Sequence, residues 1–165
     1  LQDETGWKVE PRQLAGLRFS RADIRDQRSF SEIAENTTRA EVVLGTGAVF
    51  TIFFEDGFWK FRHPDRPLAI VPTLDVQAYF SAAEEIEWQS ELISSAEQVI
   101  DTQFNFYDEN GERFYYLHVY ESTMQQRLIG TPVGVYLVDS TEFDLLLQSF
   151  TNLLQLSQAG APQAQ

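Results

Sequence analysis

The chain has no cysteine and only two histidines among its 165 residues. The absence of cysteine excludes a disulfide framework, thiolate catalysis and zinc or iron–sulfur sites built on cysteine. It leaves the compartment open, because neither a reducing cytosol nor secretion of a domain this large requires cysteine. The sequence also lacks an apolar run near the roughly 18 residues of a spanning helix, so we expect no membrane span in the chain as given.

Basic residues are scarce as well, with 12 Lys and Arg against 25 Asp and Glu and a formal net charge of −13. Residues 1–39 hold seven residues of each sign, so the whole excess falls on residues 40–165. An acidic body repels phosphate backbones and anionic lipids, which argues against nucleic acid and favours a protein partner with a basic surface. Leu1 is not a methionine, and either removal of a signal peptide or trimming of the chain would account for it. We therefore favour a periplasmic or secreted location and leave a cytoplasmic one open.

Apolar residues are abundant: 43% of the chain is hydrophobic and 13% is aromatic. This composition and length are typical of a globular domain that buries one core. We expect a single domain over residues 1–157. The tail at 158–165 has no apolar anchor and is predicted to be disordered or a linker.

The strongest local signal is Asn110-Gly111, which lies between two segments of alternating residues, 101–109 and 112–121. This dipeptide suits the positive φ angles of a two-residue type I′ turn, so it predicts a β-hairpin and its register. From the turn outward, the predicted pairs are Asp108 with Arg113, Tyr107 with Phe114, Phe106 with Tyr115, Asn105 with Tyr116, Phe104 with Leu117, Gln103 with His118, Thr102 with Val119 and Asp101 with Tyr120.

The two faces of this hairpin differ, because side chains alternate along a strand. The expected core face carries Thr102, Phe104, Phe106, Tyr115, Leu117 and Val119. The second face carries Tyr107, Phe114, Tyr116, His118 and Tyr120 beside Asp101, Gln103 and Asn105. We predict that these five rings bind a partner, since large amphipathic rings dominate interface energetics. The competing interpretation is that a helix covers them and that they belong to the core.

Further strands are predicted on both sides of this hairpin. Three alternating segments between residues 40 and 63, separated by Gly45-Thr46-Gly47 and Asp56-Gly57, predict a meander with tight turns. The second turn would pair Phe54 with Trp59, Phe53 with Lys60, Ile52 with Phe61, Thr51 with Arg62 and Phe50 with His63. Residues 68–71 would add an edge strand, and the apolar segment 132–138 a buried strand.

Helices are expected at three places. Ser29 and Glu32 match a capping box that would open a short helix ending near Asn36. Thr73 is the predicted N-cap of a second helix that buries Val76, Phe80 and Ala83. Residues 84–98 fit either a strand or a continuation of this helix, and their Ala and Glu content favours the helix.

The last helix has the clearest pattern. Asp139 and Glu142 would cap it. Its apolar residues recur every three or four positions and must pack on a sheet or a partner. They are Phe143, Leu146, Leu147, Phe150, Leu153 and Leu154.

Catalytic and metal-binding patterns are weak. His63 lies beside Asp65 and His118 faces Gln103, but no nucleophile signature accompanies either histidine. We interpret Glu84, Glu87 and Glu91 as a solvated helix face. Asp108, Asn110 and Glu112 resemble part of a calcium loop but lack its Gly and its final Glu at the required spacing, so they are assigned to the turn. We therefore predict no metal, no cofactor and no catalytic residue.

Four arginines near the N-terminus follow a spacing of three, four and three residues, which would align them on one side of a helix. They are Arg18, Arg21, Arg25 and Arg28. They are either a stripe that binds an anion or an acidic partner, or a solvated face that pairs with the acidic body.

Together these patterns predict an α+β domain with an antiparallel sheet of five to seven strands, helices on one face and an amphipathic C-terminal helix. The element order is similar to that of small acidic secretion chaperones, which dimerise and hold a partner chain; no motif supports the analogy residue by residue. We predict a non-catalytic protein-binding module of the chaperone, inhibitor, immunity or adaptor kind, and leave a homodimer open. One alternative is a small-molecule site between sheet and helix, lined by Tyr107, Tyr116 and His118. Another is a hydrolase using a histidine and a carboxylate.

Overall fold

The computed structural model describes residues 33–86, 88–91, 99–120 and 126–159. The predicted arginine stripe at 18–28, the capping box at 29–32 and the end of the predicted tail lie outside this part of the chain.

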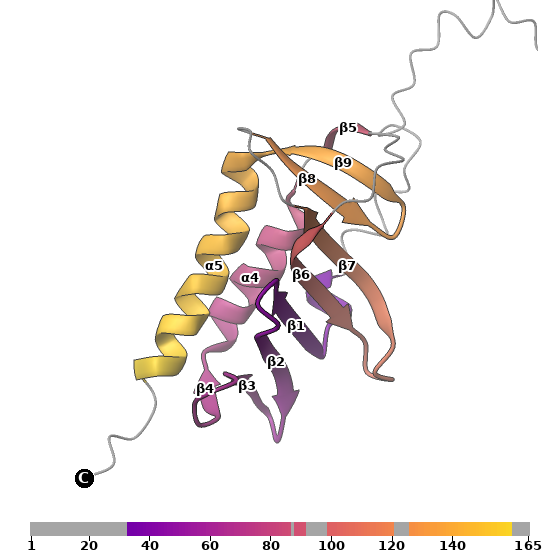
Figure 1. The fold of residues 1–165 in the computed structure, drawn as a ribbon. Helices are drawn as coiled ribbons and strands as arrows, with labels where there is room; N and C mark the ends of the chain where they lie inside the picture. Colours follow the sequence, from indigo (N-terminus) through magenta and orange to yellow (C-terminus); the bar gives the residue numbers. More distant parts are fainter. Residues whose placement is uncertain (1–32, 87, 92–98, 121–125, 160–165) are drawn as a thin grey trace, which may run out of the picture.

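The described residues form one antiparallel sheet of nine strands (Figure 1). The order across the sheet is β4-β3-β2-β1-β6-β7-β8-β9-β5. The strands are β1 (Arg39–Leu44), β2 (Val49–Glu55), β3 (Phe58–Arg62), β4 (Ala69–Val71), β5 (Trp88–Glu91), β6 (Ile100–Tyr107), β7 (Arg113–Tyr120), β8 (Gln126–Thr131) and β9 (Gly134–Asp139). The α+β class and the antiparallel sheet are confirmed, whereas the expected five to seven strands are too few.

Two helices, α4 (Thr73–Glu84) and α5 (Ser140–Ala159), lie side by side against one face of this sheet (Figure 1). A single turn of helix, α3 (Ile33–Asn36), packs beside α4, where the Glu84 carboxylate accepts a hydrogen bond from the Ala34 N–H at 2.8 Å. Glu84 therefore joins two helices. No helix in the described ranges is long and apolar enough to cross a membrane.

The core lies between these helices and the sheet and is rich in aromatic rings. Phe150 of α5 contacts Phe50, Phe61 and Tyr79 at centroid distances of 5.5, 6.1 and 6.1 Å. Four of the predicted stripe residues on α5 are buried, and Leu147 and Leu154 are partly buried against the core. The C-terminal helix is thus confirmed, and it continues to Ala159, past the expected end of the domain at residue 157.

The register of the hairpin between β6 and β7 is confirmed in its centre and wrong at both ends. The five pairs from Thr102–Val119 to Phe106–Tyr115 form as predicted. At the turn, Tyr107 pairs with Arg113 instead of Phe114, and at the far end Ile100 takes the place predicted for Asp101. The residues of the predicted core face are buried, except for Thr102, which is half-buried. The buried residues are Phe104, Phe106, Tyr115, Leu117 and Val119.

The turn itself explains the shifted end. Gly111 has a φ of 77° but Asn110 does not have a positive φ, so the type I′ prediction is wrong. The Gly111 N–H donates to the Asp108 carbonyl at 3.1 Å, and the Asp108 N–H donates to the Glu112 carbonyl at 3.0 Å. The loop thus has three residues and ends in a left-handed glycine. The Asp108 carboxylate favours this loop by accepting the N–H groups of Asn110 and Glu112, each at 2.9 Å.

The other tight turn follows its sequence signal. Asp56 and Gly57 have φ angles of 55° and 83°, as a type I′ turn requires. The four predicted pairs from Phe54–Trp59 to Thr51–Arg62 all form. The predicted edge strand is β4, at one end of the sheet. The predicted pair of Phe50 with His63 does not form, because the pairing of β2 with β3 ends at Thr51 and Arg62. The centroids of the Phe50 and His63 rings are nevertheless 5.0 Å apart.

Two other local predictions are wrong, and one strand begins later than predicted. Thr73 is not the cap of α4, because Pro72 holds that position and gives no side-chain hydrogen bond. The helix does not continue through residues 88–91, which instead form β5 and pair with β9, so tertiary pairing overrides helix propensity. The strand predicted at 132–138 is confirmed as β9, but it begins at Gly134, because Pro132 and Val133 connect β8 to β9. The sequence analysis did not predict β8.

We expect Phe104→Ala to lower the free energy of unfolding by about 3–5 kcal/mol, because this ring is fully buried and contacts Phe143 of α5. Gln103→Ala, at the preceding residue and on the opposite face, is the matched control and should cost less than about 1 kcal/mol. Denaturant titrations of both variants test this assignment of the two faces. Similar losses from the two variants would contradict it.

We expect Tyr79→Phe to leave the protein as stable as the wild type or up to about 1–2 kcal/mol more stable. The Tyr79 ring is fully buried, and its hydroxyl has no hydrogen-bond partner among the described residues. Burial also raises the pKa of this phenol. Calorimetric melting would measure the change, and a clear loss of stability would show that the hydroxyl has a partner.

Candidate functional site

The sheet face opposite α4 and α5, which we call the outer face, carries a row in which basic and aromatic residues alternate. The row crosses five neighbouring strands and every step is a register pair. Its members are Lys60 of β3, Phe53 of β2, Arg39 of β1, Tyr107 of β6 and Arg113 of β7. We call this set the cation–aromatic row.

Arginines of the outer face lie over its rings. The Arg39 guanidinium carbon is 4.9 Å from the centroid of Tyr107 within the row. Arg62 lies 5.1 Å from the centroid of Phe53, and Arg113 lies 4.8 Å from that of Tyr116. Such contacts are worth about 0.5–1 kcal/mol each at exposed sites. They restrict the rotamers of the guanidinium groups.

Two of the cations on this face are neutralised by carboxylates. Glu41 forms an ion pair with Arg39 and accepts the Tyr107 hydroxyl hydrogen at 2.8 Å. Partial burial and this hydrogen bond raise the pKa of Tyr107. The Lys60 ammonium contacts Glu55 at 2.7 Å and Asp56 at 2.8 Å, and its hydrogen bond to Asp56 contributes most to raising its pKa.

Arg62 and Arg113 differ from these two cations. Both are exposed, and neither has an ion pair with any residue in the described ranges. Arg113 donates a hydrogen bond to the Asn105 amide oxygen at 3.1 Å. The outer face thus presents two cations whose charges are not compensated by any carboxylate in the described ranges.

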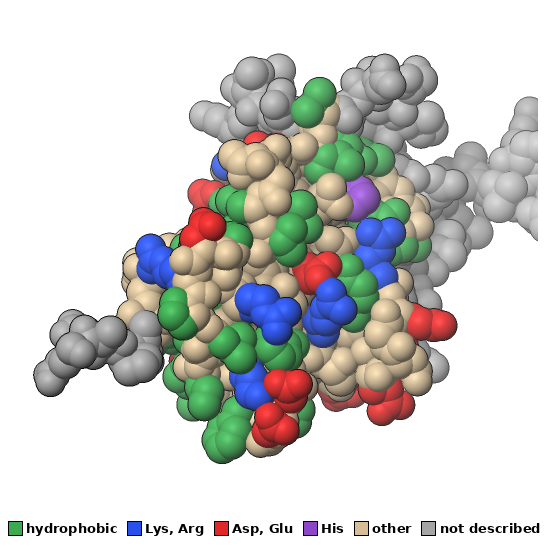
Figure 2. All heavy atoms as spheres, turned by 60° about the horizontal axis from the view of Figure 1, so that its bottom comes forward, with side chains coloured by type: hydrophobic (Ala, Val, Ile, Leu, Met, Phe, Trp, Pro, Cys, Tyr) green, Lys and Arg blue, Asp and Glu red, His purple; other side chains and the backbone are tan. Residues whose placement is uncertain are grey.

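Positive charge is concentrated on this face although the chain is acidic overall. The part of the chain described by the structure has six Lys and Arg residues, and four of them lie on the outer face. Figure 2 shows several basic side chains near the middle of the displayed face, beside apolar groups and acidic side chains. The four cations of the outer face and the three carboxylates that contact two of them, Glu41, Glu55 and Asp56, sum to a charge of +1, which is opposite in sign to the net charge of −13.

The structure brings four of the five predicted rings together on the outer face. Tyr107, Tyr116, His118 and Tyr120 are all half-buried. Tyr116 and His118 stack at a centroid distance of 4.3 Å. The Tyr120 ring lies over Gly130, where an added Cβ would come within 2.6 Å of its hydroxyl oxygen.

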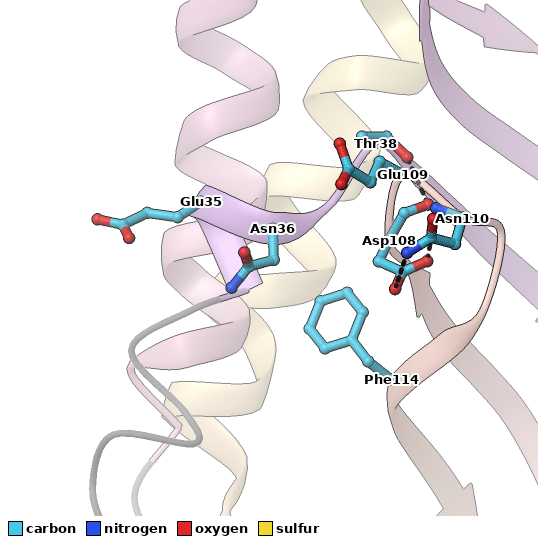
Figure 3. Close-up of a pocket in the computed structure, with 7 residues that line it drawn as sticks. All are labelled: Glu35, Asn36, Thr38, Asp108, Glu109, Asn110 and Phe114. Carbon is cyan, nitrogen blue, oxygen red and sulfur yellow. Dashed lines mark hydrogen bonds between the residues drawn. The ribbon is translucent and has the colours of Figure 1, made fainter.

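Phe114 is the predicted ring that the structure places elsewhere. The shifted register puts Arg113 opposite Tyr107, and Phe114 is packed against the buried core. It lines a hollow of about 420 Å³ at the hairpin tip (Figure 3). The other lining residues are Glu35, Asn36, Thr38, Asp108, Glu109 and Asn110.

This hollow is not the small-molecule pocket expected from the sequence, since none of Tyr107, Tyr116 and His118 lines it. Figure 3 shows that Asp108 bonds within its own turn. Its pKa is lowered chiefly by the backbone hydrogen bond from Glu112. Within the described residues no group of three or more His, Asp or Glu could hold a metal ion.

The two histidines have different surroundings. The His63 Nδ1 accepts the backbone N–H of Asp65 at 3.0 Å, which orders the loop after β3. The His118 Nε2 is buried without a hydrogen-bond partner in the described part of the chain. Burial lowers the pKa of His118, and the nearby charge of Arg113 lowers it further. Neither imidazole therefore has a hydrogen bond to a carboxylate of the described residues.

Comparisons of the chain with protein-family models, curated proteins and solved structures found no match. The sequence analysis missed Arg39, Phe53, Arg62 and Arg113 as a group. Period-two alternation places each of them on a strand face, but only the pairing of β1 with β6 joins them into one surface.

We expect the protein to lose stability as the pH falls below about 6.5, partly because of His118. Its folded-state pKa is lowered, so below this pH the unfolded chain binds a proton that the folded protein does not. The His118 contribution is present above pH 6.5 and is lost as the pH falls toward the lowered pKa. His118→Gln should therefore lose less unfolding free energy than the wild type between about pH 7 and pH 5. Parallel pH profiles for the two proteins would contradict this.

Proposed function

We propose that the protein is a non-catalytic protein-binding module and that the outer face of its sheet is the binding surface. The observation that carries this proposal is the asymmetry of the sheet. Helices α4 and α5 pack on one face, while the other presents half-buried tyrosines held beside arginines. This arrangement favours a chaperone, inhibitor, immunity or adaptor protein.

The residue types on the outer face support protein binding. Tyrosine and arginine are enriched among residues that contribute most to interface affinity. Cation–π contacts order Tyr107 and Tyr116 before any partner arrives, which reduces the entropy lost on binding. A sheet also holds its side chains at fixed spacing, so the surface is preorganised.

The shape of the site favours a protein over a small ligand. Small-molecule sites are usually concave and mostly apolar. The half-buried rings of the outer face spread over strands β6 and β7, whereas the hollow at the hairpin tip is lined mostly by polar residues. A hydrolase is less well supported, because a catalytic base needs a partner that orients it and His118 has none among the described residues.

We expect Tyr107→Ser combined with Tyr116→Ser to reduce capture of the native partner at least about tenfold, because hot-spot truncations cost about 2 kcal/mol or more. The melting temperature should fall only slightly, because both rings are half-buried and on the outer face. Leu145→Ser, on the exposed side of α5, is the matched control and should leave capture unchanged.

A photo-crosslinking amino acid at position 116 gives a direct readout in native extract. It should form a covalent adduct with one protein, and the same group at position 145 should not. A folded double tyrosine variant that captures the partner at wild-type strength would refute the proposed site. Equal adducts from both positions would refute it as well.

A further inference from the structure

We propose that the outer face recognises an acidic protein segment whose carboxylates bind Arg62 and Arg113. This inference rests on the proposed protein-binding function and adds the chemistry of the partner. It replaces the expectation of a basic partner, which followed from the net charge of the whole chain.

Of the four cations on this face, Arg62 and Arg113 are the two that have no carboxylate partner among the described residues. Arg39 is engaged by Glu41, and Lys60 is engaged by the two carboxylates at the tip of its hairpin. Arg62 and Arg113 are exposed and form no ion pair with the described residues. An incoming anion therefore gains the most binding free energy at these two guanidinium groups.

The guanidinium group of each of these arginines suits a carboxylate. A guanidinium offers parallel N–H donors that match a carboxylate in a bidentate pair. The rings of Phe53 and Tyr116 support Arg62 and Arg113 from one side. Arginine that is already ordered loses less conformational entropy when it binds.

The spacing of these two arginines restricts the shape of the partner. Arg62 lies on β3 and Arg113 on β7, which are separated by four strand intervals. At about 4.8 Å per interval, their backbones lie roughly 20 Å apart. An extended chain covers about 3.3 Å per residue, so the two carboxylates would be about six residues apart.

The surface between the arginines suits uncharged residues of the same segment. Phe53 and Tyr107 offer ring faces, and the Glu41 carboxylate between them is already engaged by Arg39 and by the Tyr107 hydroxyl. A partner with apolar or polar residues between two acidic ones complements this order.

Local charge decides binding here because salt screens the rest of the molecule. The screening length is about 8 Å at physiological ionic strength, so a docked segment senses Arg62 and Arg113 more than distant carboxylates. The acidic remainder repels the same segment elsewhere, which favours a single binding position. A nucleic acid fits less well, since its closely spaced phosphates would also meet Glu55 and Asp56.

The test uses the full chain and synthetic peptides of about ten residues with two glutamates about six positions apart. Binding is followed by the nitrogen shifts of the arginine side-chain N–H groups. Those of Arg62 and Arg113 should move and that of Arg66, an exposed arginine in the loop after β3, should not. Arg62→Gln and Arg113→Gln should each weaken binding at least about fivefold, whereas Arg66→Gln should not change it.

Comparison ligands of equal length test the partner class. A glutamine peptide should bind at least about fivefold more weakly than the glutamate peptide, because it cannot form charge-assisted pairs. Equal binding of the glutamine peptide, tighter binding of a lysine peptide, or tighter binding of a single-stranded oligonucleotide of equal charge would each overturn the inference.

Comparing peptide binding with crosslinking at position 116 distinguishes a failure of this inference from a failure of the proposed function. If no acidic peptide binds but the crosslinker at position 116 still captures one protein, the partner chemistry is wrong and the binding surface stands. If the glutamate peptide binds and only Arg62→Gln and Arg113→Gln weaken it, both are supported.

Discussion

Phe150 contacts rings from three other elements, Phe50 of β2, Phe61 of β3 and Tyr79 of α4, and the rest of the structure depends on this cluster. It holds both long helices on the same face of the sheet. Because side chains alternate along every strand, burying one face decides which residues the other must present. The outer face is therefore a consequence of core packing. A register slip of one residue would exchange the two faces.

Local signals in the sequence predicted the parts of the fold that short-range chemistry determines. Asp56-Gly57 fixed its hairpin because both residues adopt the positive φ that a type I′ turn needs. Asn110-Gly111 was a weaker guide, because the Asp108 carboxylate bonds two backbone N–H groups and favours a longer loop. The strand β5 could not be predicted from its Ala- and Glu-rich surroundings, since it forms by pairing with β9, nearly fifty residues later.

The candidate site was predictable only in part for the same reason. Alternation placed Tyr107, Tyr116, His118 and Tyr120 on one face, because that argument needs only the local strand period. Phe114 was misplaced by a register shift of one residue. Arg39 and Tyr107 meet through the pairing of β1 with β6, which joins residues 58 to 68 positions apart in the chain, and no local pattern carries that information. A binding surface formed by strands that are distant in the sequence therefore cannot be predicted from the local patterns of a single sequence.

Net charge and local charge oppose each other in this molecule, and they act at different distances. Before contact, a partner senses the whole chain at −13, so an acidic segment approaches slowly. At contact, screening leaves mainly the cations of the outer face, and Arg62 and Arg113 attract the same segment. Added salt weakens both the repulsion and the attraction, so the affinity should depend on salt less steeply than two arginine contacts alone would require. The acidic body therefore contributes to selection: it rejects weakly matched anions and leaves those that reach both arginines.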